Sequence, residues 1–119
     1  MTYFTEKEAA FTNLLIDIGM KKNVAKVLVF LANIQEATSR EIERGTDLRQ
    51  PEVSIAMQHL VDRGWIVNRE SKAENKGRPI KIYKLAIPVN DIMDSIEKEM
   101  VKITTKKLAL VHKLQKYID

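Results

Sequence analysis

The 119-residue sequence contains no cysteine, which excludes a disulfide framework, thiolate metal ligands and a cysteine nucleophile. Aromatic residues make up only 6% of the chain, so its core must be mainly aliphatic. No apolar run approaches the roughly 18 to 20 residues that cross a bilayer, and the first ten residues lack the basic head and apolar centre of a signal peptide. These absences predict a cytoplasmic protein with no membrane partner.

Motifs that carry catalysis are absent as well. The sequence has no G-x-S-x-G elbow and no P-loop, the patterns of common hydrolase and nucleotide sites. His59 and His112 lie far apart, with no carboxylate at metal-ligand spacing. The sequence therefore predicts no enzyme, no metal site and no cofactor.

Positive charge is concentrated in one segment. The net charge of the chain is +4, and residues 69–84 alone carry that excess, because six cations there face two anions. The cations are Arg69, Lys72, Lys76, Arg78, Lys81 and Lys84, and the anions are Glu70 and Glu74. A local excess of this kind favours a polyanionic partner.

Two helices are expected before residue 37. Thr5-x-x-Glu8 is a capping box that predicts a helix from about Thr5 to Ile18, followed by Gly19 as a left-handed cap. Its apolar face comprises Phe11, Leu14, Leu15 and Ile18. A second helix is expected over residues 23–33, where Val24, Val27, Leu28, Leu31 and Ala32 mark the buried side.

Residues 38–63 predict two helices joined by a tight turn. Thr38-x-x-Glu41 is a second capping box, opening a short helix that should stop at Gly45. Leu48 is expected to plug the space between the two helices. The second helix should run to about Arg63, with Pro51 in its first turn and a core face of Val53, Met57, Leu60 and Val61.

After Gly64 the sequence pattern changes from helical to strand-like. Residues 65–69 and 80–85 are β-rich runs, separated by the polar segment SKAENKGRP. They predict a basic β-hairpin directly after the helix-turn-helix. That order of elements is the layout of a winged helix-turn-helix, and the predicted fold is mainly α with a small β-hairpin (α+β).

A long terminal helix is expected beyond Pro88, capped by Asn90. Apolar residues recur there at alternating steps of three and four, the seam pattern of a coiled coil, interrupted by Lys107. The seam comprises Met93, Ile96, Met100, Ile103, Leu110, Leu114 and Tyr117. A helix of roughly 28 residues spans on the order of 40 Å. Residues 89–119 therefore predict a dimerisation helix, and residues 1–88 the DNA-binding domain.

From about Val24 to Leu85 the chain resembles the winged-helix transcription regulators of bacteria and archaea, of the TrmB, ArsR and MarR type. The resemblance rests on the segments SREIERGTDLRQPEVSIAMQHLVDRGWI and GRPIKIYKL. It implies a nucleoid-associated, homodimeric regulator that reads two half-sites of double-stranded DNA. The metal sensing of many ArsR proteins does not carry over, since their thiolate ligands are missing here. Whether a small-molecule effector exists is left open.

The expected contacts with DNA come from three places. The polar side of the second helix would read bases in the major groove, the start of the first helix would hold a phosphate, and the hairpin tip would grip the backbone or the minor groove. The candidate residues are Thr38, Ser39, Arg40, Arg49, Gln50, Pro51, Ser54, Ile55, Gln58, Lys76 and Arg78.

Two alternatives remain. The segment 49–63 has no net charge, because Arg49 and Arg63 are balanced by Glu52 and Asp62. Together with an exposed Ile55, this favours a winged-helix module that binds another protein. A chromatin-like protein that coats DNA regardless of sequence would instead rely on the hairpin charge alone.

Overall fold

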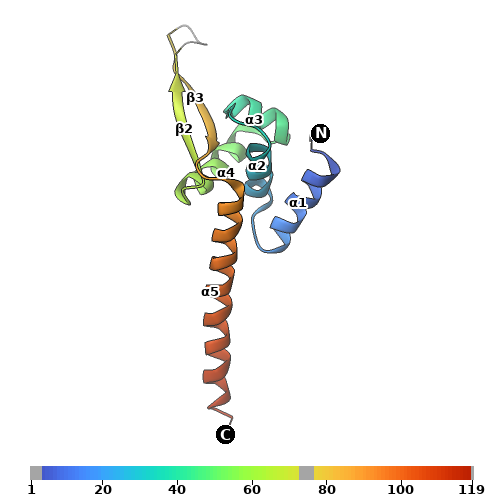
Figure 1. Cartoon of the computed structure of the whole chain (residues 1–119), viewed down its shortest axis with the longest axis vertical. Helices are drawn as coiled ribbons and strands as arrows, with labels where there is room; N and C mark the ends of the chain where they lie inside the picture. Colours follow the sequence, from blue (N-terminus) through green and yellow to red (C-terminus); the bar gives the residue numbers. More distant parts are fainter. Residues whose placement is uncertain (1–3, 73–76, 119) are drawn as a thin grey trace. The chain divides into compact units, whose positions relative to one another are not determined.

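The structure is a computed structural model that describes residues 4–72 and 77–118. Within these residues the chain forms five helices and three strands (Figure 1). They divide into two compact units, Met1–Ile87 and Pro88–Asp119. The first unit holds all of the helix-turn-helix and the hairpin, and the second is a single helix.

The first helix, α1 (Glu6–Asp17), begins at the predicted capping box. The Thr5 hydroxyl accepts a hydrogen bond from the Glu8 amide at 3.2 Å, and the Glu8 carboxylate accepts one from the Thr5 amide at 2.8 Å. The predicted apolar face is only partly covered. Leu15 is buried, whereas Leu14 and Ile18 are exposed, because α1 packs mainly against α2 and turns a neighbouring strip of its surface toward it.

The second helix, α2 (Lys22–Ala32), is the centre of the core. It contacts α1, α3 and α4, and Val27, Leu28 and Val29 are fully buried. The helical prediction is confirmed in spite of the β-branched content. Val29, which was not among the residues predicted to mark the buried side, is buried as well, because neighbouring helices enclose α2 from more than one direction.

The third helix, α3 (Ser39–Thr46), is capped by Thr38 as predicted, with the Thr38 hydroxyl 3.2 Å from the Glu41 amide. Its predicted end at Gly45 is wrong. Asp47 ends the helix in the left-handed conformation, at φ 56°. Gly45 lies inside the helix, where a Cβ would overlap the Phe30 ring. This glycine is therefore required by the approach of α2 to α3.

The fourth helix, α4 (Gln50–Asp62), has Pro51 in its first turn and ends before Gly64, which has a φ of 75°. Val53, Met57 and Leu60 are buried as predicted. Val61 is exposed, which corrects the prediction, and Ala56 is buried in its place. At 100° per residue, position 61 lies at the edge of the buried strip and position 56 lies within it.

The hairpin consists of β2 (Ile66–Ser71) and β3 (Ile80–Leu85), so the second strand matches the prediction and the first is displaced by one or two residues. Trp65 is buried just before β2, and the Arg63 guanidinium lies 4.3 Å from the centroid of its ring. The buried Trp65 ring therefore anchors the hairpin to the core.

A third strand was not predicted. β1 (Ala37–Thr38) pairs antiparallel with β3, so the sheet order is β1-β3-β2. Thr38 lies opposite Ile82 in this pairing. Two residues are too few to show an alternating pattern, so the sequence indicated only a loop at this position.

The second unit contains α5 (Val89–Gln115), a 27-residue helix. Its predicted cap at Asn90 is wrong. Pro88 precedes the helix, and its carbonyl accepts hydrogen bonds from the amides of Asp91 at 3.0 Å and Ile92 at 3.2 Å. Pro88, in an extended conformation, occupies the cap position, so the helix begins at Val89 and Asn90 lies in its first turn. Among the described residues, no helix is long and apolar enough to cross a membrane.

Replacing Gly45 with Ala should destabilise the protein by about 1 to 2 kcal/mol, because over-packing against Phe30 outweighs the higher helix propensity of alanine. Urea unfolding of the variant and the parent measures the difference. Adding Phe30→Leu to Gly45→Ala should cost less than the sum of the two single changes, since the smaller side chain leaves room for the methyl group. An unchanged or raised stability of the Gly45→Ala single variant would contradict the contact.

Candidate nucleic-acid interface

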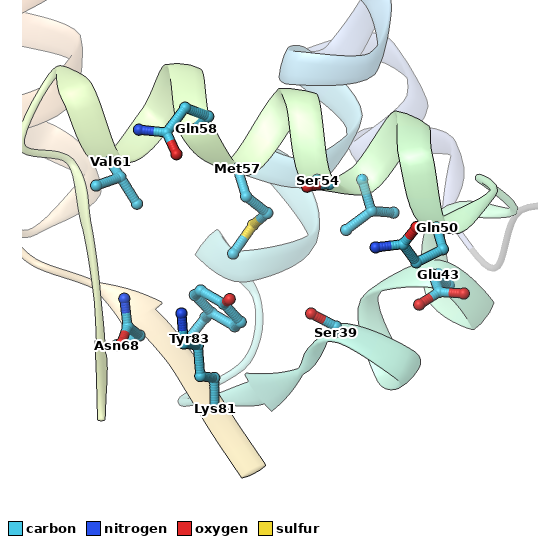
Figure 2. A pocket seen from close by; sticks show the side chains of 11 residues that line it. Ser39, Glu43, Gln50, Ser54, Met57, Gln58, Val61, Asn68, Lys81 and Tyr83 are labelled. Atoms are coloured by element: carbon cyan, nitrogen blue, oxygen red, sulfur yellow. The ribbon is translucent and has the colours of Figure 1, made fainter. Parts of the chain in front are cut away.

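A hollow of about 260 Å³ lies between α3, α4 and the hairpin. Figure 2 shows side chains from all three elements around it, with α4 on one side and β3 on the other. Polar groups dominate the lining, which comprises Ser39, Glu43, Gln50, Val53, Ser54, Met57, Gln58, Val61, Asn68, Lys81 and Tyr83. The hollow thus lies between the helix predicted to read bases and the hairpin whose tip was predicted to contact DNA.

Three of the predicted base-reading residues lie together along this hollow. Gln50, Ser54 and Gln58 are exposed and line its α4 side. The Gln58 amide donates a hydrogen bond to the Asp62 carboxylate at 2.8 Å, four residues along the helix. This bond is at the surface, so its net contribution to stability is small. Within the first unit, the polar row formed by Gln50, Ser54 and Gln58 is therefore accessible to a binding partner.

Ile55 lies apart from that row. Its side chain is 65% exposed and lines a different, shallow groove formed with the start of α2, together with Lys21, Lys22, Asn23, Val24, Glu52, Ala56 and His59. Positions 54 and 55 point about 100° apart on a helix, which explains the separation. The sequence had grouped Ile55 with the base-reading residues, and the structure brings it to the opposite flank of α4.

The residues at the starts of α3 and α4 have differing surroundings. The Thr38 hydroxyl and amide are both taken up by the capping box with Glu41, so Thr38 acts as a cap. Ser39 lines the hollow, and Arg40 is exposed. At α4, Arg49 and Pro51 are exposed, and the Arg49 amide donates to Glu52 at 3.0 Å.

The cations of the hairpin are divided between its two faces. Residues directly opposite each other in an antiparallel pair point to the same face, so Asn68, Tyr83 and Lys81 share the face that lines the hollow. Arg69 and Lys84 lie on the other face. The charge excess seen in the sequence is therefore not presented to one side.

One of these cations is already paired. The Arg69 guanidinium lies 2.8 Å from the Glu36 carboxylate, and both side chains are partly exposed. Arg78 is exposed near the end of the hairpin. Lys76, the other predicted tip contact, lies outside the described residues.

Four residues that line the hollow were not among the predicted DNA contacts: Glu43, Asn68, Lys81 and Tyr83. The alternation of β3 separates Lys81 and Tyr83 from Ile80 and Ile82, so the pattern held part of the signal. It did not show which face turns toward α4, because that depends on how the sheet packs on the helices.

The predicted seam of α5 is exposed over most of its length. Met93 and Ile96 are half-buried, Met100, Ile103, Leu110 and Leu114 are exposed, and Tyr117 is exposed beyond the end of the helix. Val101, Leu108 and Val111 are exposed too. At helical spacing they lie beside the seam and widen its apolar surface.

Among the described residues, no three His, Cys, Asp or Glu side chains are grouped so that they hold a metal ion. The polar groups that line the hollow are amides, hydroxyls, one carboxylate (Glu43) and one cation (Lys81). Such groups bind polar ligands and do not by themselves activate a substrate.

A family model of the MarR family matches residues 18–74 of the chain. This segment contains α2, β1, α3, α4 and β2. The match confirms the resemblance to winged-helix regulators that the helix-turn-helix residues predicted. A comparison with curated proteins gave no match.

Solved structures share the fold at low sequence identity. A possible transcriptional regulator from Methanosarcina mazei Go1 is 13% identical, with a TM-score of 0.61, covering 80% of this chain and 82% of that one. MepR of S. aureus, solved in complex with DNA, is 19% identical, with a TM-score of 0.52 and coverages of 92% and 89%. A homodimeric winged helix-turn-helix domain from Mycobacterium bovis, possibly of the ArsR family, is 17% identical, with a TM-score of 0.50 and coverages of 90% and 92%.

Residues 18–74 are thus similar to the MarR family of proteins, and the fold is that of a winged helix-turn-helix.

Replacing Glu36 with Gln should release Arg69 on the face of the hairpin that lies away from the hollow. The affinity for any DNA duplex should therefore rise at low salt only as much as the change in net charge explains. The gain should vanish near 1 M salt, where the Debye length falls to about 3 Å. Fluorescence anisotropy with a random duplex measures the effect. Glu97→Gln on α5 makes the same charge change in the second unit and should give an equal gain. A clearly larger gain in Glu36→Gln would place Arg69 at the DNA.

Proposed function

We propose that this chain, a winged-helix protein of the MarR type, is a sequence-specific, DNA-binding transcription regulator that acts as a homodimer in the prokaryotic cytoplasm. The observation that supports it most directly is the polar row of Gln50, Ser54 and Gln58 on the hollow-facing side of α4. A helix in the major groove reads base edges with such groups. The solved DNA complex of MepR, which shares the fold, supports the same partner.

The proposal assigns different tasks to the helix and the wing, here defined as β2, β3 and their connection. The α4 segment 49–63 has no net charge, so it contributes choice of sequence more than affinity. Phosphate attraction then comes from the wing, through residues such as Arg78 and Lys76, and from Arg40 and Arg49 beside the first turns of α3 and α4. Binding should consequently be sensitive to salt.

Homodimer formation is assigned to α5. A helix of 27 residues with most of its apolar seam exposed needs a partner to cover it. A second copy provides an identical seam, and two copies related by a two-fold axis match the two half-sites of a palindrome. The homodimeric domain from Mycobacterium bovis shows the same fold in a paired state.

Ile55 supports a second candidate function. It is exposed in an apolar groove away from the polar row, as expected if the module bound a protein partner through that flank of α4. In that case Ile55→Ala would abolish partner binding and leave the DNA affinity unchanged. A weaker DNA affinity in Ile55→Ala would instead indicate that Ile55 belongs to the DNA interface.

The first test is binding to genomic and random duplexes over a salt series. Gln50→Ala/Ser54→Ala should lose the preference for genomic sites, at about 1 to 3 kcal/mol for each base pair no longer read, and keep its affinity for random DNA. Lys76→Ala/Arg78→Ala should weaken binding to both and reduce the salt dependence. Asn13→Ala, an exposed change on α1, is the control. If no duplex binds at low salt, the proposal is wrong; equal affinity for all sequences would favour a chromatin-like role.

The second test concerns the dimer. Leu110→Lys places a charge in the seam and should shift the protein from dimer to monomer at micromolar concentration, because the charge would be buried in the interface. Ala109→Lys, one position away and off the seam, should leave the mass unchanged. Sedimentation equilibrium measures both. A monomeric parent protein, or dissociation by both variants alike, would remove α5 as the specific interface.

A further inference from the structure

We propose that the hollow between α4 and the wing seats one sugar–phosphate strand of duplex DNA, with Lys81 contacting a phosphate and Asn68 and Tyr83 donating hydrogen bonds to it. This inference rests on the proposed function and names the partner of a surface that was not foreseen from the sequence. Three observations support it: the position of the hollow, the face of the wing on which Lys81 lies, and the polar residues that line the hollow.

The position follows from the geometry of DNA. If α4 enters the major groove and the wing reaches the neighbouring minor groove, a sugar–phosphate strand lies between the two, because adjacent major and minor grooves share one strand as their common edge. That strand must then pass between α4 and the wing. The hollow of about 260 Å³ occupies this position, with Gln58 and Ser54 on one wall and Asn68 and Lys81 on the other.

The faces of the wing decide which cation meets the strand. Lys81 lies on the face that lines the hollow, and Lys84, three residues along the same strand, lies on the opposite face. Arg69 lies on the same face as Lys84 and is paired with Glu36. Lys81 is thus the one wing cation among the described residues that lines the hollow, although it carries the same charge as its neighbours.

The lining fits a phosphate more than an apolar ligand. Figure 2 shows the Lys81, Tyr83 and Asn68 side chains on the wing side, with Ser39 beyond them. Phenol, amide and hydroxyl groups all donate hydrogen bonds to phosphate oxygens. Glu43, the acidic residue in the lining, lies by Gln50 at the far end from Asn68 (Figure 2). The phosphate seat is therefore the end formed by Lys81, Asn68 and Tyr83.

The matched pair Lys81→Gln and Lys84→Gln tests this seat in the full-length protein. Both remove one exposed charge from β3, and they differ in the face affected. Lys81→Gln should weaken binding roughly tenfold at low salt, and should lower the slope of log K against log salt by about 1 for each bound protomer. Lys84→Gln should leave both quantities close to those of the parent. Thermal melting of both variants checks that the fold is intact.

A second variant and a footprint separate a backbone contact from a base contact. Tyr83→Phe keeps the ring and removes the hydroxyl, so it should weaken genomic and random duplexes by the same factor. Ethylation of the seated phosphate should block the parent protein, and this interference should be absent in Lys81→Gln.

The outcomes distinguish this proposal from the proposed function. If the parent binds no duplex, the proposed function fails and takes this inference with it. If the parent binds and the two lysine variants weaken it equally, or Lys84→Gln has the larger effect, the seat in the hollow is wrong and DNA binding stands. A weakening confined to the preferred sequence in Lys81→Gln would also overturn the seat, because phosphate contacts carry no base preference.

Discussion

Pairing of β1 with β3 holds the wing against the helix-turn-helix. Thr38 lies opposite Ile82 in the sheet and at the same time caps α3 through its hydroxyl. The start of α3 is therefore attached to the return strand of the wing by backbone hydrogen bonds, and α3 packs on α4 in turn. These contacts hold the wall formed by β3 at a set position relative to the polar row on α4, so the hollow between them is part of the fold.

The role of each wing cation depends on its position in the folded chain. In the sequence, the wing supplies the whole net charge of the chain. In the structure, Lys81 turns toward α4, Lys84 turns away, and Arg69 is paired with Glu36. Attraction to a polyanion at long range depends on the total, whereas a contact with one phosphate depends on the face. The same separation applies to α4, where Ser54 and Ile55 are neighbours in sequence and serve different surfaces.

Packing of the core shows why small residues occur where they do. Gly45 gives the Phe30 ring room between α2 and α3. In α4, the small residue Ala56 is buried, whereas the larger Val61 is exposed. Both choices bring α4 and α3 close to α2, the central helix. The apolar residues left over on α5 have no such partner within their own unit, which is the physical reason for proposing a second copy of the chain.

Local sequence signals were sufficient to predict the helices, the capping boxes at Thr5 and Thr38, the return strand of the wing and the class of the fold, because each of these features is periodic or short-range. The pairing of β1, the role of Gly45, the cap of α5, the exposure of Val61 and the face on which Lys81 lies emerged only from the folded chain. Most of these features depend on contacts between segments far apart in the sequence, such as Phe30 with Gly45 and Ala37 with Tyr83. Local patterns show which residues share a face, and packing alone shows what that face meets.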